Sequence, residues 1–289
     1  MVLGMFEYMK KIFLVLLAVL ISLSLAAKGK IVTFDIDSKI LGCEKTTSVY
    51  LPEGYDQNDD EYYPVLYLLH GLGGTHNTWK EYGVLTISDM HFAAGLANPM
   101  IIVMPDASGV NENHRGRNSG YANRPGWMYE DFFFEELIPA VEEMYRTKVG
   151  KEYRAVAGLS MGGHGSALFA MSKPEYFSSA YLMSARLSGV PEISPDRTED
   201  YVEMLREYEF TRIFPEMTGE EIAEISQVRW FLDCGDDDYL LDGTLTLFAQ
   251  MRSKGVPVEL RVRNGAHNKY YWIESLPMAL TFVSAGFEK

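Results

Sequence analysis

The chain has 289 residues, 47% of them hydrophobic, which suits one large domain with a sizeable core. Its 40 acidic and 26 basic residues give a formal net charge of −14, and the acidic residues are spread along the chain. Such a surface repels nucleic acid and anionic membranes, so neither is expected as a partner. The sequence contains no internal repeat or low-complexity linker, which predicts a single domain over residues 27–289.

The N-terminus has the pattern of a secretory signal peptide over residues 1–26. Lys10 and Lys11 precede the apolar run of residues 12–25, and small residues follow it. Because the run is short for a membrane span, we expect cleavage near Ala26, export to the periplasm or the exterior, and no stable membrane association afterwards. A retained N-terminal anchor helix is the alternative.

The rest of the chain alternates between strand-like and helix-like segments. Residues 30–52 alternate apolar and polar side chains, which predicts an antiparallel pair of strands with one solvated face. Short, nearly all-apolar segments typical of strands buried on both faces lie at residues 63–71, 100–106, 153–160, 179–185, 228–236 and 258–267. Helix-like segments lie between most of them and after the last, at residues 131–146, 161–174, 240–255 and 272–287. This alternation predicts an α/β fold with a mostly parallel central sheet flanked by helices.

One connection is far longer than the others. Residues 187–227 separate two predicted strands and are strongly charged. Connections of this length are usually functional when they lie over strand ends, so we interpret the segment as a helical cap insertion beside the site. An insertion without a role in the site is the alternative.

Cys43 and Cys234 are the only cysteines, and both fall in predicted strands far apart in sequence. An exported protein could pair them, but we favour buried free thiols. Neither has neighbours with the spacing of a metal site, and no metal or organic cofactor is expected.

Ser160 stands at the centre of a G-x-S-x-G sequence formed with Gly158 and Gly162. A predicted strand precedes it and a predicted helix follows, which is the context of a nucleophile elbow. The turn is so tight that glycine is required beside the serine, whose hydroxyl stands at a helix N-terminus, where negative charge is favoured. A serine that only caps the helix is the alternative.

In a nucleophile elbow enzyme the acid and the histidine follow the serine in that order. His164 and His267 are the histidines after Ser160, and His164 lies in the predicted helix with no room for an acid before it, so we interpret it as a packing residue. His267 ends the last predicted strand and is the candidate base, with an ordinary loop histidine as the alternative. The acid should follow the preceding strand, and position alone leaves open Asp236, Asp237, Asp238 and Asp242.

Such a reaction also requires N–H donors for a developing oxyanion. The N–H of Met161, directly after the candidate nucleophile, is one predicted donor. The sequence HGLGG at residues 70–74 follows a predicted strand, and its glycines let the main chain turn its amides toward the site. Leu72 is the predicted second donor; glycines that serve only a tight turn are the alternative.

With these residues the chain resembles the "putative esterase" family of α/β-hydrolases. This family includes esterase D (S-formylglutathione hydrolase), the feruloyl and acetyl-xylan esterases of carbohydrate esterase family 1, and the mycolyltransferases. The resemblance covers nearly all of the mature chain, is most specific in GLSMGGHGSA, and implies an α/β-hydrolase fold. In the family the acid stands in a Cys-Gly-x-x-Asp-aromatic-Leu pattern, which corresponds to Asp238. The same matching implies Ser160 as the nucleophile and His267 as the base.

The resemblance implies a serine carboxylic-ester hydrolase that forms an acyl-enzyme without a cofactor. The predicted signal peptide departs from cytosolic esterase D, so the expected substrate is a feruloyl or acetyl ester on plant cell-wall carbohydrate. Trp79, Tyr239 and Trp272 lie close to the motif loops and are candidate acyl-pocket residues, with core packing as the alternative. Alternative functions are acyl transfer to a sugar, hydrolysis of S-formylglutathione or a siderophore ester, and non-catalytic carbohydrate binding.

Overall fold

A computed structural model describes residues 28–109, 120–189 and 199–287. The predicted signal peptide and residues 190–198 of the predicted cap lie outside the described residues. Within the described ranges, no helix combines the length and the apolar character that a membrane span requires.

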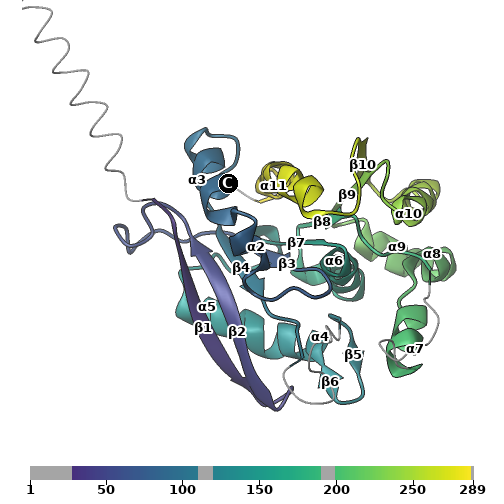
Figure 1. Ribbon diagram of the computed structural model, residues 1–289, viewed down its shortest axis with the longest axis horizontal. Coiled ribbons are helices and arrows are strands. Elements are labelled where there is room, and N and C mark those ends of the chain that lie inside the picture. The colour runs from purple at the N-terminus through teal and green to yellow at the C-terminus, as the bar shows by residue number, and fades with distance from the viewer. Residues whose placement is uncertain (1–27, 110–119, 190–198, 288–289) are drawn as a thin grey trace, which may run out of the picture.

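An eight-stranded sheet forms the centre of the protein, in the order β1-β2-β4-β3-β7-β8-β9-β10 (Figure 1). Its strands are β1 (Lys30–Ser38), β2 (Cys43–Leu51), β3 (Val65–Leu69), β4 (Ile101–Pro105), β7 (Arg154–Leu159), β8 (Ser179–Met183), β9 (Arg229–Gly235) and β10 (Val258–Arg263). β2 runs antiparallel to β1 and β4, and the other neighbouring pairs are parallel. The predicted mostly parallel sheet with an antiparallel N-terminal pair is confirmed.

The last strand differs from the prediction. Residues 258–267 are predicted as a strand buried on both faces, but β10 lies at the edge of the sheet and Val262 is 42% exposed. Charged residues at alternate positions, Glu259, Arg261 and Arg263, are typical of an edge strand, which has no neighbour on one side.

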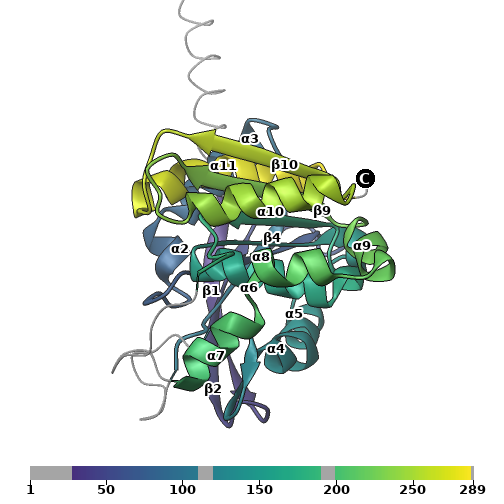
Figure 2. The same ribbon diagram turned by 90° about the vertical axis from the view of Figure 1, so that its right-hand side faces the viewer.

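Helices cover both faces of the sheet (Figure 2). Side chains alternate along β3, so Tyr67 and Leu69 pack on one face and Leu66 and Leu68 on the other. The first face is covered by α5 (Ile138–Met144), α6 (Met161–Ser172) and α10 (Leu241–Ser253), and the second by α3 (Val84–Ala93) and α11 (Lys269–Ser284). The protein therefore has three layers, with apolar clusters on both sides of the sheet.

The predicted helix over residues 131–146 is present and contains a π-helical segment. A short helix α4 (Tyr129–Asp131) continues into a π-helical segment, η1 (Phe132–Leu137), before α5 begins. Phe133 and Phe134 both contact the ring of Phe169, at centroid distances of 4.2 and 5.3 Å. A π-helical turn brings consecutive side chains closer in direction than an α-helical turn, so both rings reach the same neighbour.

The described part of the long insertion is helical, as predicted. It consists of α7 (Glu199–Glu207), α8 (Phe210–Ile213), the 3-10 turn η4 (Phe214–Glu216) and α9 (Gly219–Ile225). Phe210, Phe214 and Ile225 are buried in the apolar cluster on the α6 side of the sheet. The insertion is therefore part of the core on that face (Figure 2).

Gly162 lies where the first turn of α6 crosses the end of β3. A Cβ at this position would lie 2.4 Å from the Leu69 carbonyl oxygen and 2.6 Å from the His70 carbonyl oxygen. Because both contacts are with main chain, no change of rotamer relieves them. We predict that Gly162→Ala lowers the free energy of unfolding by about 1–3 kcal/mol, measured by urea denaturation.

Gly219→Ala is the control for this prediction. A Cβ at Gly219, the first residue of α9, meets no atom within 4 Å, and alanine favours the helix. This variant should be as stable as the wild type or slightly more stable. Equal losses of stability in the two variants would contradict the steric explanation.

Candidate active site

Ser160 alone forms the turn between β7 and α6. Its φ of 54° and ψ of −113° lie in a region that side-chain-bearing residues rarely adopt. Its N–H donates to the Met183 carbonyl at 2.8 Å, and its carbonyl accepts from the His164 N–H at 3.0 Å. The side chain makes no capping hydrogen bond to the described first turn of α6. The strained turn therefore turns the hydroxyl away from the helix.

Ser160, His267 and Asp238 form a continuous line of hydrogen bonds. The Ser160 hydroxyl lies 2.9 Å from His267 Nε2. On the other side of the ring, Nδ1 lies 2.9 Å from Asp238 Oδ2 and 3.1 Å from Oδ1. A carboxylate accepts and a hydroxyl can donate, so the ring carries its proton on Nδ1 and presents a lone pair to the serine. The structure thus brings together the three residues that the sequence singles out.

Asp238 is placed as an ionised acceptor. Its side chain is fully buried, and the Leu240 N–H donates to Oδ1 at 2.9 Å. Burial raises the pKa of this carboxyl, but the hydrogen bonds from His267 and the Leu240 N–H outweigh burial and hold the pKa below its ordinary value. A carboxylate at this point accepts the Nδ1–H of His267 and fixes the orientation of its ring.

The loops that carry Asp238 and His267 are joined directly. The Gly265 N–H donates to Asp236 Oδ1 at 2.9 Å. A Cβ at Gly235 would lie 2.1 Å from the Gly265 carbonyl oxygen, so the loop after β9 and the loop after β10 are in main-chain contact. Asp236, one of the acids that position alone left open, therefore holds the histidine loop in place.

The predicted oxyanion donors lie on both sides of the serine. Met161 opens α6 directly after Ser160. A Cβ built on Gly71 would lie 3.5 Å from the Ser160 Cβ, so the peptide that joins Gly71 to Leu72 passes beside the nucleophile. Within the described residues, neither the Leu72 N–H nor the Met161 N–H has a hydrogen-bond acceptor. Two N–H groups of this kind meet the requirement of an oxyanion hole.

Comparison with known proteins identifies the family of this chain. The family model described as "Putative esterase" matches residues 38–283. The chain belongs to this esterase family. The central sheet flanked by helices is the α/β-hydrolase fold of the solved esterase structures to which the chain is similar.

Individual relatives cover the chain to different extents. A solved structure of a ferulic acid esterase is 38% identical, with a TM-score of 0.83 over 90% of this chain and 99% of that one. An endo-1,4-beta-xylanase/feruloyl esterase of Xylanibacter ruminicola is 34% identical over 57% of this chain and 23% of its own length. Esterase MT1326 of Mycobacterium tuberculosis is 35% identical over 51% of this chain and 30% of its own length. The chain thus spans less than a third of the length of these two curated relatives.

Tyr239 and Trp272 flank the imidazole of His267, with centroid distances of 4.7 and 5.0 Å. Tyr239 is 76% exposed, whereas Trp272 is 9% exposed and packs edge-on against the ring. Trp79 lies in the core instead of the site: it is 1% exposed, and its Nε1–H donates to the Leu69 carbonyl at 3.1 Å. This corrects the prediction for Trp79, whose indole N–H is satisfied beneath the sheet and is not available to a substrate.

Tyr82 is a neighbour of the site that no sequence motif marks. Its ring contacts Trp79 at a centroid distance of 5.9 Å and stacks on Trp272 at 6.4 Å. Because Trp272 in turn packs against His267, a continuous aromatic row connects the core to the imidazole. The row restricts the rotation of the ring that faces the serine.

His164 and the two cysteines take no part in the hydrogen-bonded line at Ser160. His164 is 4% exposed, and its Nε2–H donates to the Tyr208 carbonyl at 3.0 Å. Burial lowers the pKa of His164 to about 3, so its ring is neutral. Cys43 and Cys234 are both free, as favoured from the sequence; Cys234 is buried, whereas Cys43 is half-buried. Burial raises the pKa of the Cys234 thiol to about 12.

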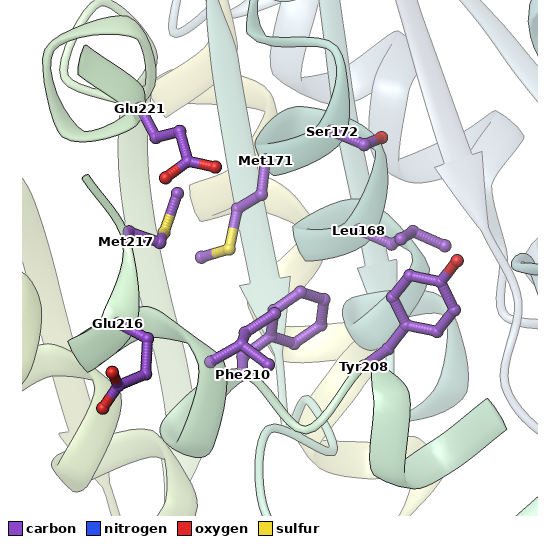
Figure 3. A pocket seen from close by; sticks show the side chains of 9 residues that line it. Leu168, Met171, Ser172, Tyr208, Phe210, Glu216, Met217 and Glu221 are labelled. Atoms are coloured by element: carbon purple, nitrogen blue, oxygen red, sulfur yellow. The ribbon is translucent and has the colours of Figure 1, made fainter. Parts of the chain in front are cut away.

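A cavity of about 340 Å³ lies between α6 and the insertion (Figure 3). Leu168 and Met171 of α6 face Phe210 and Met217 of the insertion across it. Leu168 lies about 12 Å along the helix from Ser160, at 1.5 Å per residue. The cavity is therefore separate from the hydrogen-bonded line at the serine.

The choice of acid can be tested with two neighbouring carboxylates. We predict that Asp238→Asn lowers kcat/KM for p-nitrophenyl acetate by about 10³-fold or more, because asparagine favours the wrong tautomer of His267. Asp237→Asn changes an exposed neighbour in the same way and should leave the rate unchanged. Similar losses in both variants, with circular dichroism showing intact folding, would contradict the assignment of Asp238.

The pH dependence gives a second readout of the same pair. Because hydrogen bonds hold the pKa of Asp238 below its ordinary value, its carboxylate is already charged on the acid side of neutral pH, so a single group, the proposed base, should set the acid limb. We therefore expect kcat/KM to rise with pH along a limb of slope one. In Asp238→Asn this limb should move to lower pH, since the imidazolium loses its counter-charge. A slope of two in the wild type would show that a second group titrates.

Proposed function

We propose that this protein is an exported serine carboxylic-ester hydrolase that removes feruloyl or related acyl groups from plant cell-wall carbohydrate. One observation carries the proposal: an unbroken hydrogen-bonded line from Ser160 through His267 to Asp238, at a nucleophile elbow. The chain that contains it is 38% identical to a ferulic acid esterase over 99% of that protein. The signal-peptide pattern of residues 1–26 supports export.

The geometry supports a two-step reaction through an acyl-enzyme. Ser160 Oγ attacks the ester carbonyl carbon while its proton passes to His267 Nε2, and Asp238 stabilises the resulting imidazolium. The N–H groups of Leu72 and Met161 hold the oxyanion of the tetrahedral intermediate. When the intermediate collapses, His267 gives the proton to the leaving alcohol. A water molecule then gives a proton to His267 and attacks the acyl carbon. When this second intermediate collapses, the bond between Ser160 Oγ and the acyl carbon breaks and His267 returns the proton to Ser160 Oγ, which releases the acid.

The surroundings of the serine favour an aromatic acyl group. Tyr239 and Leu72 are 76% and 65% exposed beside the hydrogen-bonded line, and exposed large apolar side chains at a polar site commonly contact a ligand. The flat Tyr239 ring can stack on a feruloyl ring or on the apolar face of a sugar. A net charge of −14 also favours release of the product, because hydrolysis converts a neutral ester into an anion.

The proposal predicts ester hydrolysis that depends on Ser160 and prefers aromatic acids. Release of free acid from methyl ferulate, p-nitrophenyl acetate and p-nitrophenyl butyrate should be measured for the mature protein and for Ser160→Ala. We expect the highest kcat/KM with methyl ferulate and a loss of about 10³-fold or more in the variant. Preference for the aliphatic esters would contradict the proposed feruloyl specificity. Equal, negligible turnover by both proteins would contradict the proposal that the protein is an ester hydrolase.

Acyl transfer is an outcome of the same assay. If addition of an acceptor sugar diverts the product from free acid to a new ester, the acyl-enzyme reacts with the sugar in preference to water. Binding of glycan without any ester turnover would identify a non-catalytic carbohydrate-binding protein. Free acid as the dominant product at all acceptor concentrations supports the hydrolase.

Tyr239 provides a test of the acyl contact. We predict that Tyr239→Ala lowers kcat/KM for methyl ferulate by about 3- to 10-fold, the value of one aromatic stacking contact, with less effect on p-nitrophenyl acetate. Tyr270→Ala is the control, because Tyr270 is also exposed, at 68%, and follows His267 closely in sequence. Equal effects on both esters would show that Tyr239 acts through His267 and not through the acyl group.

A further inference from the structure

His70 is a buried histidine beside the candidate oxyanion hole that the reaction itself does not use. It follows β3 directly, is 1% exposed, and contacts main chain on both sides of its ring. The Ala107 N–H donates to its Nε2 at 2.9 Å, and its Nδ1 lies 2.8 Å from the Gly71 carbonyl oxygen. A main-chain N–H only donates and a carbonyl only accepts, so the ring is neutral and carries its proton on Nδ1.

The surroundings of His70 keep it in this state. Burial lowers its pKa to about 4, although the Gly71 carbonyl and the Asp106 carboxylate, 3.9 Å from Nε2, oppose the shift. Protonation of Nε2 would place its N–H opposite the Ala107 N–H, so that two donors would face each other and the hydrogen bond would be lost. The Tyr121 hydroxyl donates to the His70 carbonyl at 2.9 Å and holds its backbone. The ring therefore has one arrangement, a bridge between the ends of β3 and β4.

The bridge determines the orientation of one peptide. The Gly71 carbonyl accepts from His70 Nδ1–H and from the Gly74 N–H, the latter at 3.0 Å. The described residues contain no cis peptide bond, so in the peptide between Gly71 and Leu72 the C=O and the N–H point in opposite directions. A carbonyl held toward His70 therefore directs the Leu72 N–H to the other side. This peptide lies beside Ser160, as the short distance from Gly71 shows.

We propose that His70 is a positioning residue for the oxyanion hole: through the Gly71 carbonyl, it holds the Leu72 N–H toward the oxyanion that forms on Ser160. The inference rests on the proposed function, because it requires an oxyanion at this point. Without the Nδ1–H donor, the Gly71 carbonyl keeps only the Gly74 N–H, so the peptide is held less firmly and can more easily turn its carbonyl oxygen toward the site. A carbonyl dipole in that orientation repels the oxyanion instead of stabilising it.

Two variants of similar size separate this role from a merely structural one. In His70→Asn the side-chain N–H₂ occupies the place of Nδ1 and can still donate to the Gly71 carbonyl. In His70→Gln the amide reaches the place of Nε2, so the contact with the Ala107 N–H is kept and the donor to Gly71 is lost. Each variant removes one buried hydrogen bond, so both should have a lowered Tm. Only His70→Gln should lose the orientation of the peptide between Gly71 and Leu72.

We expect kcat for methyl ferulate to fall on the order of 10²-fold in His70→Gln, with KM little changed, as for loss of one oxyanion donor. His70→Asn should retain most of the wild-type kcat. If His70→Gln does not fold, His70→Ala removes the same donor and should show the same loss of kcat. Equal kcat values in the Asn and Gln variants, whether both high or both low, would overturn the proposal.

A second readout does not depend on the identity of the ester. A fluorophosphonate probe phosphonylates an active serine: the Ser160 Oγ–P bond forms, the P–F bond breaks, fluoride leaves and the serine proton passes to His267. The phosphoryl oxygen gains negative charge in the oxyanion hole, so His70→Gln should be labelled more slowly than His70→Asn, followed by mass spectrometry. Equal labelling rates in these two variants would overturn the proposed role of His70 but not the proposed function. Labelling of the wild type no faster than of Ser160→Ala overturns the proposed function and, with it, the role of His70.

Discussion

The crossing of α6 over the end of β3 is the constraint on which the site depends. A Cβ at Gly162 would lie 2.4 Å from the Leu69 carbonyl oxygen, and a Cβ at Gly158 would lie 2.4 Å from the Gly162 carbonyl oxygen. This closeness leaves room for one residue in the turn, so Ser160 adopts a φ of 54°. Such strain costs about 1–3 kcal/mol and persists because the packed sheet on either side supports it. The same turn points the hydroxyl outward and leaves the Met161 N–H at the helix N-terminus.

The proposed base, His267, is positioned by a second buried arrangement, independent of the serine turn. Asp233 of β9 is fully buried, and its carboxylate accepts from the hydroxyls of Tyr181 at 2.7 Å and Tyr271 at 2.5 Å. A polar group in the core must be hydrogen-bonded, so these contacts hold β8, β9 and α11 in one arrangement. Because Tyr271 lies in the first turn of α11, the network also anchors the loop that carries His267. The distance between serine and base thus follows from core packing.

Local patterns account for what the sequence predicts well, and tertiary neighbours for what it does not. The turn at Ser160 is recognisable because its glycines and flanking elements are adjacent in sequence. Asp238 is not distinguishable from the acids beside it, since only its approach to His267 sets it apart; family resemblance made the choice. The core position of Trp79 and the π-helical form of residues 132–137 could not be predicted for a related reason. Their arrangement depends on partners, such as the ring of Phe169, that come from elsewhere in the chain.

Three histidines near the serine show that environment, and not residue type, decides which one can act as a base. His70 and His164 use their ring nitrogens on main-chain groups, and burial lowers their pKa values to about 4 and about 3. A ring that gains a proton needs a counter-charge in contact, and the nearest carboxylate to His70, on Asp106, is 3.9 Å away. His267 instead donates to Asp238 and faces the Ser160 hydroxyl. It alone of the three has both a proton donor and a compensating charge, which supports the proposal that the histidine in the loop after β10 takes the serine proton.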